Sequence, residues 1–278
     1  MKKTNYQFIT AGDFQKYEKF GSYILTRPAS LAVWPLNKKF ENHSAQFIRK
    51  ASGEGEWDFK QKLPISWQTH FNSLDFIIKP TGLGNVGLFP EQASEWSWFE
   101  EIIPRLPQSA RILNLFAYTG GSSMVCARLG AEVTHLDAAR GVVDWARENA
   151  RLNRLESARI HWLTEDAQRF VQREIRRKNR YHGIILDPPS FGRGPKGEVW
   201  KLEEHIYPLL SMLFQLLEKN NSFLHLSCHT PGFTPQVLKQ LMMAFKETAQ
   251  YQLTVGELVI PYDQGEFPAG SFIRIFNM

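Results

Sequence analysis

An acid followed by two prolines, Asp187-Pro188-Pro189, stands directly after the apolar run 184–186, and Phe191 follows closely. Proline restricts φ and lacks an N–H donor, so this turn presents a carboxylate and carbonyl groups as acceptors with little freedom. A base turned out of a nucleic-acid helix carries an edge of N–H groups and a flat face, which such acceptors and an aromatic ring can hold. A plain loop accounts for two prolines, but not for the acid before them and the aromatic residue after them. We therefore expect Asp187, Pro188, Pro189 and Phe191 to form a site for chemistry.

A glycine turn is the second candidate site. Gly120 and Gly121 connect an apolar strand expected at 111–116 to a helix, and such a turn lets a ligand meet unpaired backbone N–H groups. The next strand ends in Asp137, 17 positions after Gly120 (137 − 120), near the interval of about 20 residues at which an acid meets ribose hydroxyls. The residues expected to contact a cofactor here are Asn114, Phe116, Tyr118, Thr119, Gly120, Ser122 and Asp137.

The glycine turn also bears on which cofactor binds. A nicotinamide dinucleotide needs a G-x-G-x-x-G turn for its pyrophosphate, whereas Tyr118 and Thr119 stand here in place of glycines. S-adenosylmethionine (SAM) has no phosphate and needs less room, so the sequence favours SAM. A double glycine can also be a simple strand-to-helix turn. Asp166, in the polar turn after the third strand, could accept the adenine amino group of the cofactor, or it could be only a helix N-cap.

The chain has two cysteines, Cys126 and Cys228, which form neither a disulfide framework nor a zinc-binding pattern, and we expect no metal site. Cys228 ends the fifth strand, which we expect beside the fourth. A thiolate there could act as a nucleophile toward a base held by Asp187. Burial as a small apolar residue is an equally good interpretation of Cys228, and the better one for Cys126.

Beyond residue 109, short apolar runs alternate regularly with amphipathic helices, which is typical of a parallel sheet covered on both faces. Residues 6–81 are instead a small β-rich region that ends at a Pro- and Gly-containing break, and a helix is expected at 91–106. We predict an N-terminal domain at 1–84 and a second domain at 85–278. The expected strands of the second domain are 111–116, 132–136, 159–162, 183–186, 222–227, 257–261 and 271–276, and its helices are 121–129, 140–152, 167–178, 201–218 and 234–248.

Two basic stretches offer contacts for phosphates. Residues 192–200, with Arg193 and Lys196, are expected to form a flexible loop that could close over a substrate, although a solvated connection is the alternative. The cations between Arg173 and Arg180 are better explained by their place at a helix C-terminus.

The overall composition limits the class of protein and the kinds of partner to be expected. A chain of 278 residues with 43% hydrophobic and 22% charged residues has enough apolar material for a packed core. No run approaches the ~18 apolar residues of a membrane span and no secretory h-region follows the N-terminus, so we expect a cytoplasmic protein with no membrane partner. A formal charge of +5 and a pI near 9.1 favour a polyanionic partner, but charge alone does not establish one.

The residues of both sites resemble those of a known family. The segments 114–120 and 187–191, together with Asp137, are similar to class I SAM methyltransferases related to the bacterial 23S ribosomal RNA cytosine-C5 methyltransferase. The similarity covers roughly residues 79–278, and residues 79–82 and 87–92 resemble the lead-in to the methyltransferase core. Two features depart from the family pattern. We expect this chain to lack the N-terminal PUA domain of the cytosine enzyme, and Ala93 stands where relatives often carry arginine.

The resemblance implies a Rossmann-like α/β fold with a seven-stranded methyltransferase sheet. It also implies SAM as the cofactor and RNA as the partner, with ribosomal RNA as the first candidate. It also implies a nucleophilic role for Cys228, which slightly favours methylation of cytosine C5. Transfer to an exocyclic amine is the alternative within this class, and it needs no nucleophile. A nicotinamide-dependent oxidoreductase and an inactive RNA-binding module are the alternatives from other classes. The oligomeric state is not indicated by the sequence.

Overall fold

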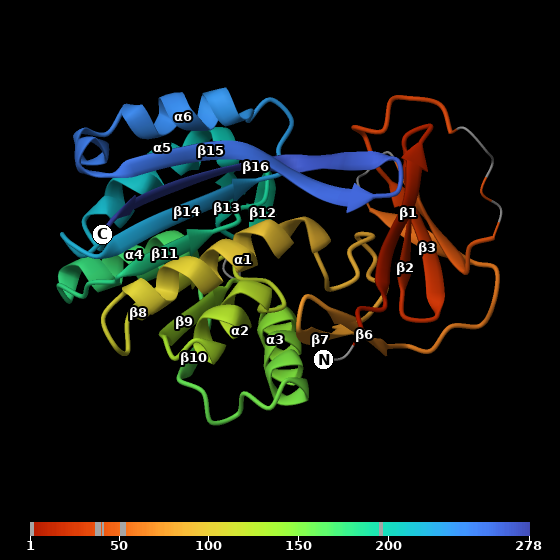
Figure 1. The fold of residues 1–278 in the computed structure, drawn as a ribbon, viewed down its shortest axis with the longest axis horizontal. Coiled ribbons are helices and arrows are strands. Elements are labelled where there is room, and N and C mark those ends of the chain that lie inside the picture. Colours follow the sequence, from red (N-terminus) through yellow and green to blue (C-terminus); the bar gives the residue numbers. More distant parts are fainter. Residues whose placement is uncertain (1–2, 37–39, 41, 51–53, 195–196) are drawn as a thin grey trace. The chain divides into compact units, whose positions relative to one another are not determined.

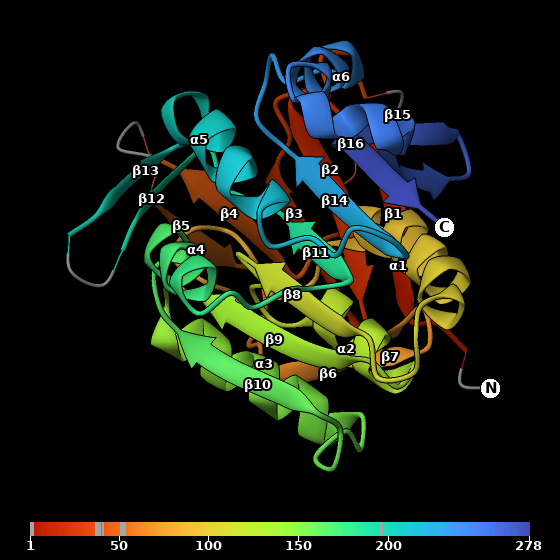
Figure 2. The ribbon, with the colours of Figure 1, turned by 90° about the vertical axis from the view of Figure 1, so that its left-hand side faces the viewer.

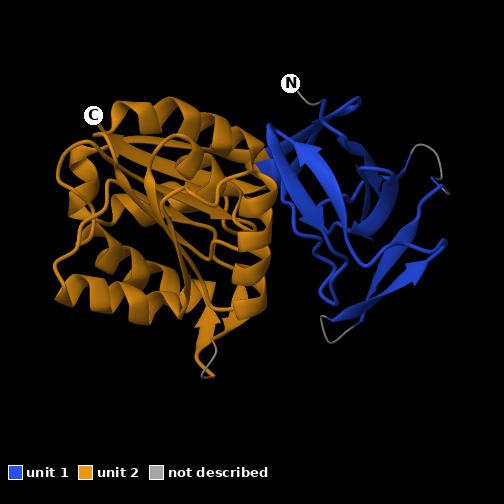
Figure 3. Ribbon diagram, turned by 90° about the horizontal axis from the view of Figure 1, so that it is seen from below, with its two compact units in different colours: residues 1–91, 259–269 blue, residues 92–258, 270–278 orange. Residues whose placement is uncertain are grey.

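The structure is a computed structural model that describes residues 3–36, 40, 42–50, 54–194 and 197–278. The chain forms two compact units (Figure 3). Unit 1 contains residues 1–91 and 259–269, and unit 2 contains residues 92–258 and 270–278. Residues 259–269 group with unit 1, although the domain boundary expected from the sequence at residue 84 placed them in the second domain.

Unit 1 is rich in β-structure, as the sequence predicts. Its described residues form a five-stranded sheet in the order β1-β2-β3-β4-β5 and a separate hairpin, β6-β7 (Figure 1). Glu18, fully buried, forms an ion pair with Arg27 and accepts a hydrogen bond from the Tyr6 hydroxyl at 3.0 Å. The strands are β1 (Tyr6–Gly12), β2 (Gln15–Phe20), β3 (Tyr23–Pro28), β4 (Ala45–Arg49), β5 (Gly55–Phe59), β6 (Trp67–Phe71) and β7 (Leu74–Ile78).

Unit 2 has the Rossmann-like α/β fold with the seven-stranded sheet that the resemblance implies. The order of its strands within the described residues is β10-β9-β8-β11-β14-β16-β15. Neighbouring strands from β10 to β14 are parallel, whereas β16 pairs antiparallel with β14. The strands are β8 (Arg111–Leu115), β9 (Glu132–Asp137), β10 (Ile160–Thr164), β11 (Gly183–Leu186), β14 (Ser222–Cys228), β15 (Gln252–Tyr262) and β16 (Gly265–Asn277).

Helices cover both faces of this sheet (Figure 2). Side chains of β14 alternate between the faces, because successive residues of a strand point to opposite sides. Phe223 and His225 meet the aromatic residues of α1, while Leu224, Leu226 and Cys228 belong to the apolar core with α4, α5 and α6. The helices are α1 (Ala93–Ile102), α2 (Gly121–Arg128), α3 (Arg140–Leu152), α4 (Ala167–Arg176), α5 (Leu202–Phe214) and α6 (Pro235–Met243), with short 3₁₀ segments η1 (Pro90–Gln92), η2 (Ile103–Arg105) and η3 (Lys246–Gln250).

The structure corrects several expected elements. The expected loop 192–200 is largely an antiparallel two-stranded ribbon of β12 (Phe191–Arg193) and β13 (Val199–Lys201), because its side chains alternate between solvent and the buried Trp200. Residues 195–196, with Lys196, lie outside the described residues. The last two strands are longer than expected, and β16 pairs with β14 over residues 271–277. None of the described helices is long and apolar enough to cross a membrane.

Candidate active site

The two predicted turns meet at one edge of the unit 2 sheet. The glycine turn follows β8, and the turn of Asp187 follows β11, which pairs directly and in parallel with β8. On its other side β8 pairs with β9, so the strand order reverses between β8 and β11. Ligands of open α/β sheets bind outside the carboxyl ends of the strands at such a reversal.

The turn after β8 has an unusual backbone. Phe116, Tyr118 and Gly120 have φ values of 55°, 49° and 87°, all in the left-handed region. Bulky residues rarely adopt this conformation, and it persists mainly at functional sites where the surroundings impose it. Glycine is required at two positions. A Cβ at Gly120 would combine that φ with a 3.2 Å approach to Ala146, and a Cβ at Gly121 would lie 2.4 Å from the Trp96 ring.

Asp137 shapes the turn from the end of the neighbouring strand. Its Oδ2 accepts a hydrogen bond from the backbone N–H of Tyr118 at 3.0 Å, and its Oδ1 accepts one from the backbone N–H of Ala139 at 3.0 Å. Burial raises the pKa of this carboxyl above its ordinary value. Each carboxylate oxygen has a second lone pair, so the bonds to the backbone leave acceptor capacity for ribose hydroxyls.

Other residues that were predicted to contact the cofactor form hydrogen bonds within the protein around this turn. Asn114 is buried and donates to Ser123 Oγ at 2.9 Å, and that oxygen lies 2.9 Å from Nδ1 of His135. Burial lowers the pKa of His135 to about 3, so this network is uncharged. The Thr119 carbonyl accepts a hydrogen bond from the Asn149 side chain at 3.0 Å.

Two further predicted residues have local partners. Ser122 Oγ accepts a hydrogen bond from the indole N–H of Trp96 at 3.1 Å. Asp166 is the N-cap of α4 and accepts a hydrogen bond from the backbone N–H of Arg169 at 2.9 Å, which confirms the cap expected from the sequence. A contact of either residue with the cofactor stays a prediction.

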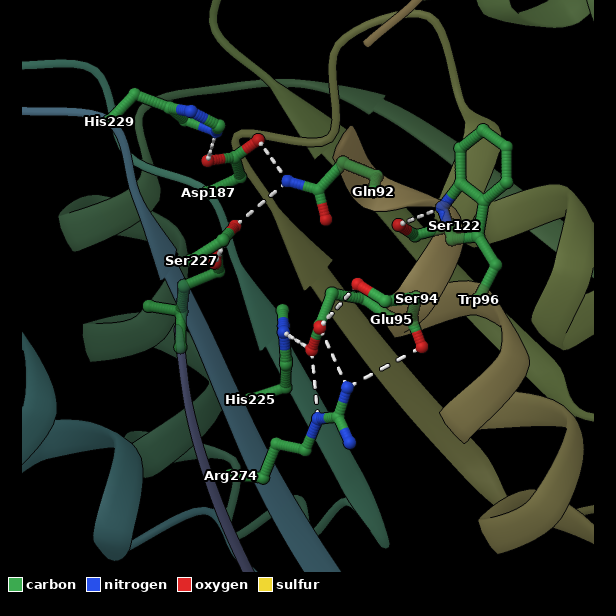
Figure 4. Close-up of polar contacts among 11 residues, drawn as sticks. Gln92, Ser94, Glu95, Trp96, Ser122, Asp187, His225, Ser227, His229 and Arg274 are labelled. Atoms are coloured by element: carbon green, nitrogen blue, oxygen red, sulfur yellow. Dashed lines mark hydrogen bonds and ion pairs between the residues drawn. The ribbon is translucent and has the colours of Figure 1, made fainter. Parts of the chain in front are cut away.

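Asp187 is held by side chains from two other elements (Figure 4). Gln92 Nε2 donates to Asp187 Oδ2 at 3.0 Å and to Ser227 Oγ at 3.1 Å. His229 Nε2 lies 3.2 Å from Asp187 Oδ1, close enough for an ion pair, and this oxygen is buried. Burial raises the pKa of Asp187, but His229 and Ser227 lower it further, so the pKa lies below its ordinary value. The carboxylate is therefore ionised, with Gln92 bound to one oxygen and His229 beside the other.

A buried ion-pair cluster locks α1 onto the sheet one helical turn beyond Gln92. Glu95 is fully buried and lies 2.6 Å from His225 Nε2, and Arg274 of β16 contacts both of its oxygens, at 2.9 and 2.7 Å (Figure 4). Because Gln92 is the N-cap of α1 and Glu95 lies in its first turn, this cluster also holds Gln92 against Asp187.

The second half of the Asp187 turn is tied to the turn after β8. Pro188 is buried, and the carbonyl of the exposed Pro189 accepts a hydrogen bond from the indole N–H of Trp200 at 2.7 Å. The Trp200 ring packs against Phe116 with a centroid separation of 4.9 Å. Phe191 is 55% exposed and lies on the face of the ribbon opposite Trp200.

Cys228 is only 1% exposed and packs in the core on the α5 side of the sheet. Burial raises the pKa of its thiol, and it does the same for Cys126. The sequence did not indicate Gln92, Ser227 and His229 as partners of Asp187. The one available signal was the family-like lead-in, which ends at Gln92. Among the described residues, no cluster of His, Cys, Asp or Glu is arranged to hold a metal ion.

Comparison with known proteins agrees with this geometry. Residues 33–250 match the family model described as S-adenosylmethionine-dependent methyltransferase. The crystal structure of a SAM-dependent methyltransferase from Agrobacterium tumefaciens superposes with a TM-score of 0.92 at 34% identity, covering 100% of this chain and 92% of that one.

The curated relatives match a smaller part of this chain than that crystal structure does. The ribosomal RNA large subunit methyltransferase K/L of Shewanella frigidimarina is 24% identical over 74% of this chain. The ribosomal RNA large subunit methyltransferase I of Aeromonas hydrophila is 30% identical over 49% of this chain. The matched part of the chain spans only 28% and 34% of the lengths of these two relatives.

Proposed function

Because the chain belongs to the S-adenosylmethionine-dependent methyltransferase family, we propose that it transfers a methyl group from SAM to a base of RNA, with ribosomal RNA as the first candidate substrate. The observation that carries this proposal is the ionised carboxylate of Asp187, oriented by Gln92 and His229 beside the cofactor turn. The names of the curated relatives support ribosomal RNA. Work on ribosomal RNA would place the protein in the cytoplasm.

The residues present suit SAM. The left-handed turn from Phe116 to Gly120 and the start of α2 expose backbone to a ligand that carries no phosphate, and Asp137 has lone pairs left for ribose hydroxyls. In this proposal Asp166 accepts a hydrogen bond from the adenine amino group of SAM. When bound, SAM supplies an electrophilic methyl group on a sulfonium. The nicotinamide alternative is set aside because the chain belongs to the methyltransferase family.

Asp187 and the turn around it would position the base. In this proposal the carboxylate accepts an N–H of the amino group of the base, which restricts the direction of the nitrogen lone pair. The same carboxylate can take up the proton that the nitrogen loses. The exposed ring of Phe191 offers a surface on which the base can stack.

The burial of Cys228 favours transfer to an exocyclic amine over transfer to cytosine C5. A C5 mechanism needs a thiolate within reach of the base, whereas this thiol packs among apolar side chains and its pKa is raised. The C5 mechanism keeps one supporting observation, since β14, which ends at Cys228, pairs directly with β11. RNA that carries 5-fluorocytosine separates the two, because only the C5 mechanism traps a covalent adduct, and Cys228→Ala would abolish it.

A comparison of modified bases tests the proposed function. Total RNA from a strain that lacks the protein should contain one unmethylated position that the intact chain restores and the Asp187→Ala variant does not. An unchanged modification map in that strain would contradict the proposal and favour the inactive RNA-binding module.

A further inference from the structure

The ribbon β12-β13 has two chemically different faces. Its register pairs Phe191 with Lys201 and Arg193 with Val199, while Trp200 lies between these pairs, opposite Gly192. Because side chains alternate along a strand and directly opposed residues share a face, the two outer pairs point one way and Trp200 points the other. The outer face of the ribbon is hereafter the face formed by Phe191, Arg193, Val199 and Lys201. Figure 2 shows β12 and β13 extending away from the helices of unit 2.

The Trp200 face anchors the ribbon. Trp200 is 8% exposed, donates to the carbonyl of Pro189, and packs against Phe116 and His205. Glu198 forms an ion pair with Arg169 of α4 at 3.0 Å. An isolated two-stranded ribbon is marginally stable, so these contacts give it a defined orientation beside the two turns of the site.

The outer face combines apolar and cationic side chains without an acid. Phe191 and Val199 are 55% and 45% exposed, and each has a cation directly across the ribbon. Arg193 has no acidic partner among the described residues. Lys201 pairs at 2.8 Å with Glu204, but both side chains are exposed, and such a pair exchanges partners at little cost.

We propose that the outer face of the ribbon binds an unpaired RNA segment next to the target nucleotide. Exposed aromatic side chains stack on bases, aliphatic ones pack against them, and the cations beside them meet phosphates, which is how single strands are held. A double-stranded segment would not fit as well, because its bases are stacked and hidden inside the helix. Phe191 lies four positions after Asp187, so the outer face begins where the target base is held. This inference rests on the proposed function.

Binding of fluorescein-labelled RNA to the full chain tests the inference. The probes are a 15-nucleotide single strand of mixed sequence and the matching duplex, followed by fluorescence anisotropy. The paired variant Arg193→Gln/Lys201→Gln should weaken binding of the single strand at least tenfold. The slope of log K against log salt should fall by about 0.7 for each cation removed. Val199→Ser should weaken binding without changing that slope.

A matched control removes two exposed cations elsewhere in unit 2. Arg176→Gln/Lys178→Gln at the end of α4 changes the net charge by the same amount and should leave both the affinity and its salt dependence unchanged. SAM affinity should be the same in every variant, which shows that unit 2 remains folded. In methyl transfer, the loss in the ribbon variant should appear mainly in the KM for RNA.

The outcomes separate this inference from the proposed function. Methylation of RNA by the unaltered chain, together with unchanged single-strand binding by the ribbon variant, would overturn the inference and leave the proposed function standing. Equal losses in the ribbon and control variants would overturn it too, as would tighter binding of the duplex through the ribbon or a self-association lost in the ribbon variant. Single-strand binding through the ribbon without methyl transfer to RNA would support the inference and contradict the proposed function.

Discussion

Gln92, at the start of α1, donates both of its amide hydrogens to the ends of two strands, to Asp187 Oδ2 at 3.0 Å and to Ser227 Oγ at 3.1 Å. The bond to Asp187 occupies one carboxylate oxygen and fixes the plane of the carboxylate. The other oxygen, Oδ1, lies 3.2 Å from His229 Nε2. The orientation of the proposed acceptor is therefore set by a residue 95 positions away in the sequence.

Replacing Gln92 by Ala should slow methyl transfer about 10- to 100-fold, because the loss of a hydrogen bond to a charged group is worth about 1.5–3 kcal/mol. SAM affinity should stay within about twofold, since Gln92 contacts the Asp187 turn. Ser227→Ala is the matched control, because it removes the other partner of the same amide and should cost much less. Single-turnover transfer and calorimetric SAM binding measure both quantities. Equal losses in the two variants would show that Gln92 acts only through packing.

The pH dependence of transfer should report Asp187. Burial raises the pKa of this carboxyl, but His229, with Ser227 and His225, lowers it below its ordinary value. A group with a lowered pKa stays ionised until the pH falls through that value, so activity should be lost only at low pH. His229→Gln removes a group that lowers the pKa of Asp187, so the effect of burial should raise that pKa. The acid limb of the pH–rate profile should therefore move to higher pH.

His161 provides the control for that experiment. It is exposed on β10 and paired with Glu132, so His161→Gln should leave the profile unchanged. Carbon-13 NMR of labelled aspartate would follow the Asp187 titration without any substrate. An acid limb that does not move in His229→Gln would contradict the assigned pairing.

The Glu95 cluster should dominate the acid stability of unit 2. Burial raises the pKa of Glu95, yet His225 and Arg274 lower it to about 2 from an ordinary value of 4.5. A lowered pKa stabilises the folded state fully above the unfolded value, so this contribution should disappear as the pH falls from about 4.5 to about 2. Arg274→Gln leaves a buried carboxylate short of a partner and should destabilise the unit by about 3 kcal/mol.

Arg128→Gln is the matched control in urea unfolding at pH 7. Its partner Glu100 also belongs to α1, but both side chains are partly exposed, and the loss should be below about 1 kcal/mol. Similar losses in the two variants would argue against the special role of the buried cluster.

Asp137 should contribute to SAM binding through its remaining lone pairs. Asp137→Asn keeps the size of the side chain but replaces one acceptor oxygen with a donor, so it disturbs both the Tyr118 bond and the proposed ribose contact. We expect SAM affinity to fall by about 1–3 kcal/mol. Isothermal titration of folded Asp137→Asn checks this, and an unchanged SAM affinity would exclude the proposed placement of the cofactor.

The sequence identified the parts of the site that are local in the chain. The strand, turn and helix around Gly120 and the acid before Pro188 carry their own signals, because backbone conformation and proline chemistry act over a few residues. The alternation of short apolar runs with amphipathic helices beyond residue 109 correctly predicted the α/β sheet. Strands of a sheet that is covered on both faces are buried on both sides, so they appear in the sequence as continuous apolar runs. The N-cap role of Asp166 was predicted for the same local reason.

What the sequence could not predict depends on distant residues. Gln92 meets Asp187, and Glu95 meets Arg274, only because α1 packs on β14 and β16. The ribbon was mistaken for a loop because strands of three residues are too short to show a clear alternation. The side of the sheet on which Cys228 lies could not be predicted either, because a shift of one residue in register would reverse it.

The most direct test of the account is transfer of a tritiated methyl group from SAM to RNA purified from a strain that lacks the protein. The purified chain should label large ribosomal RNA to a level near one methyl group per molecule. Asp187→Ala should bind SAM normally and label nothing, because the acceptor that orients the base is gone. Label found only in protein or small molecules, or full labelling of RNA by Asp187→Ala, would contradict the central claim that Asp187 positions an RNA base for methylation.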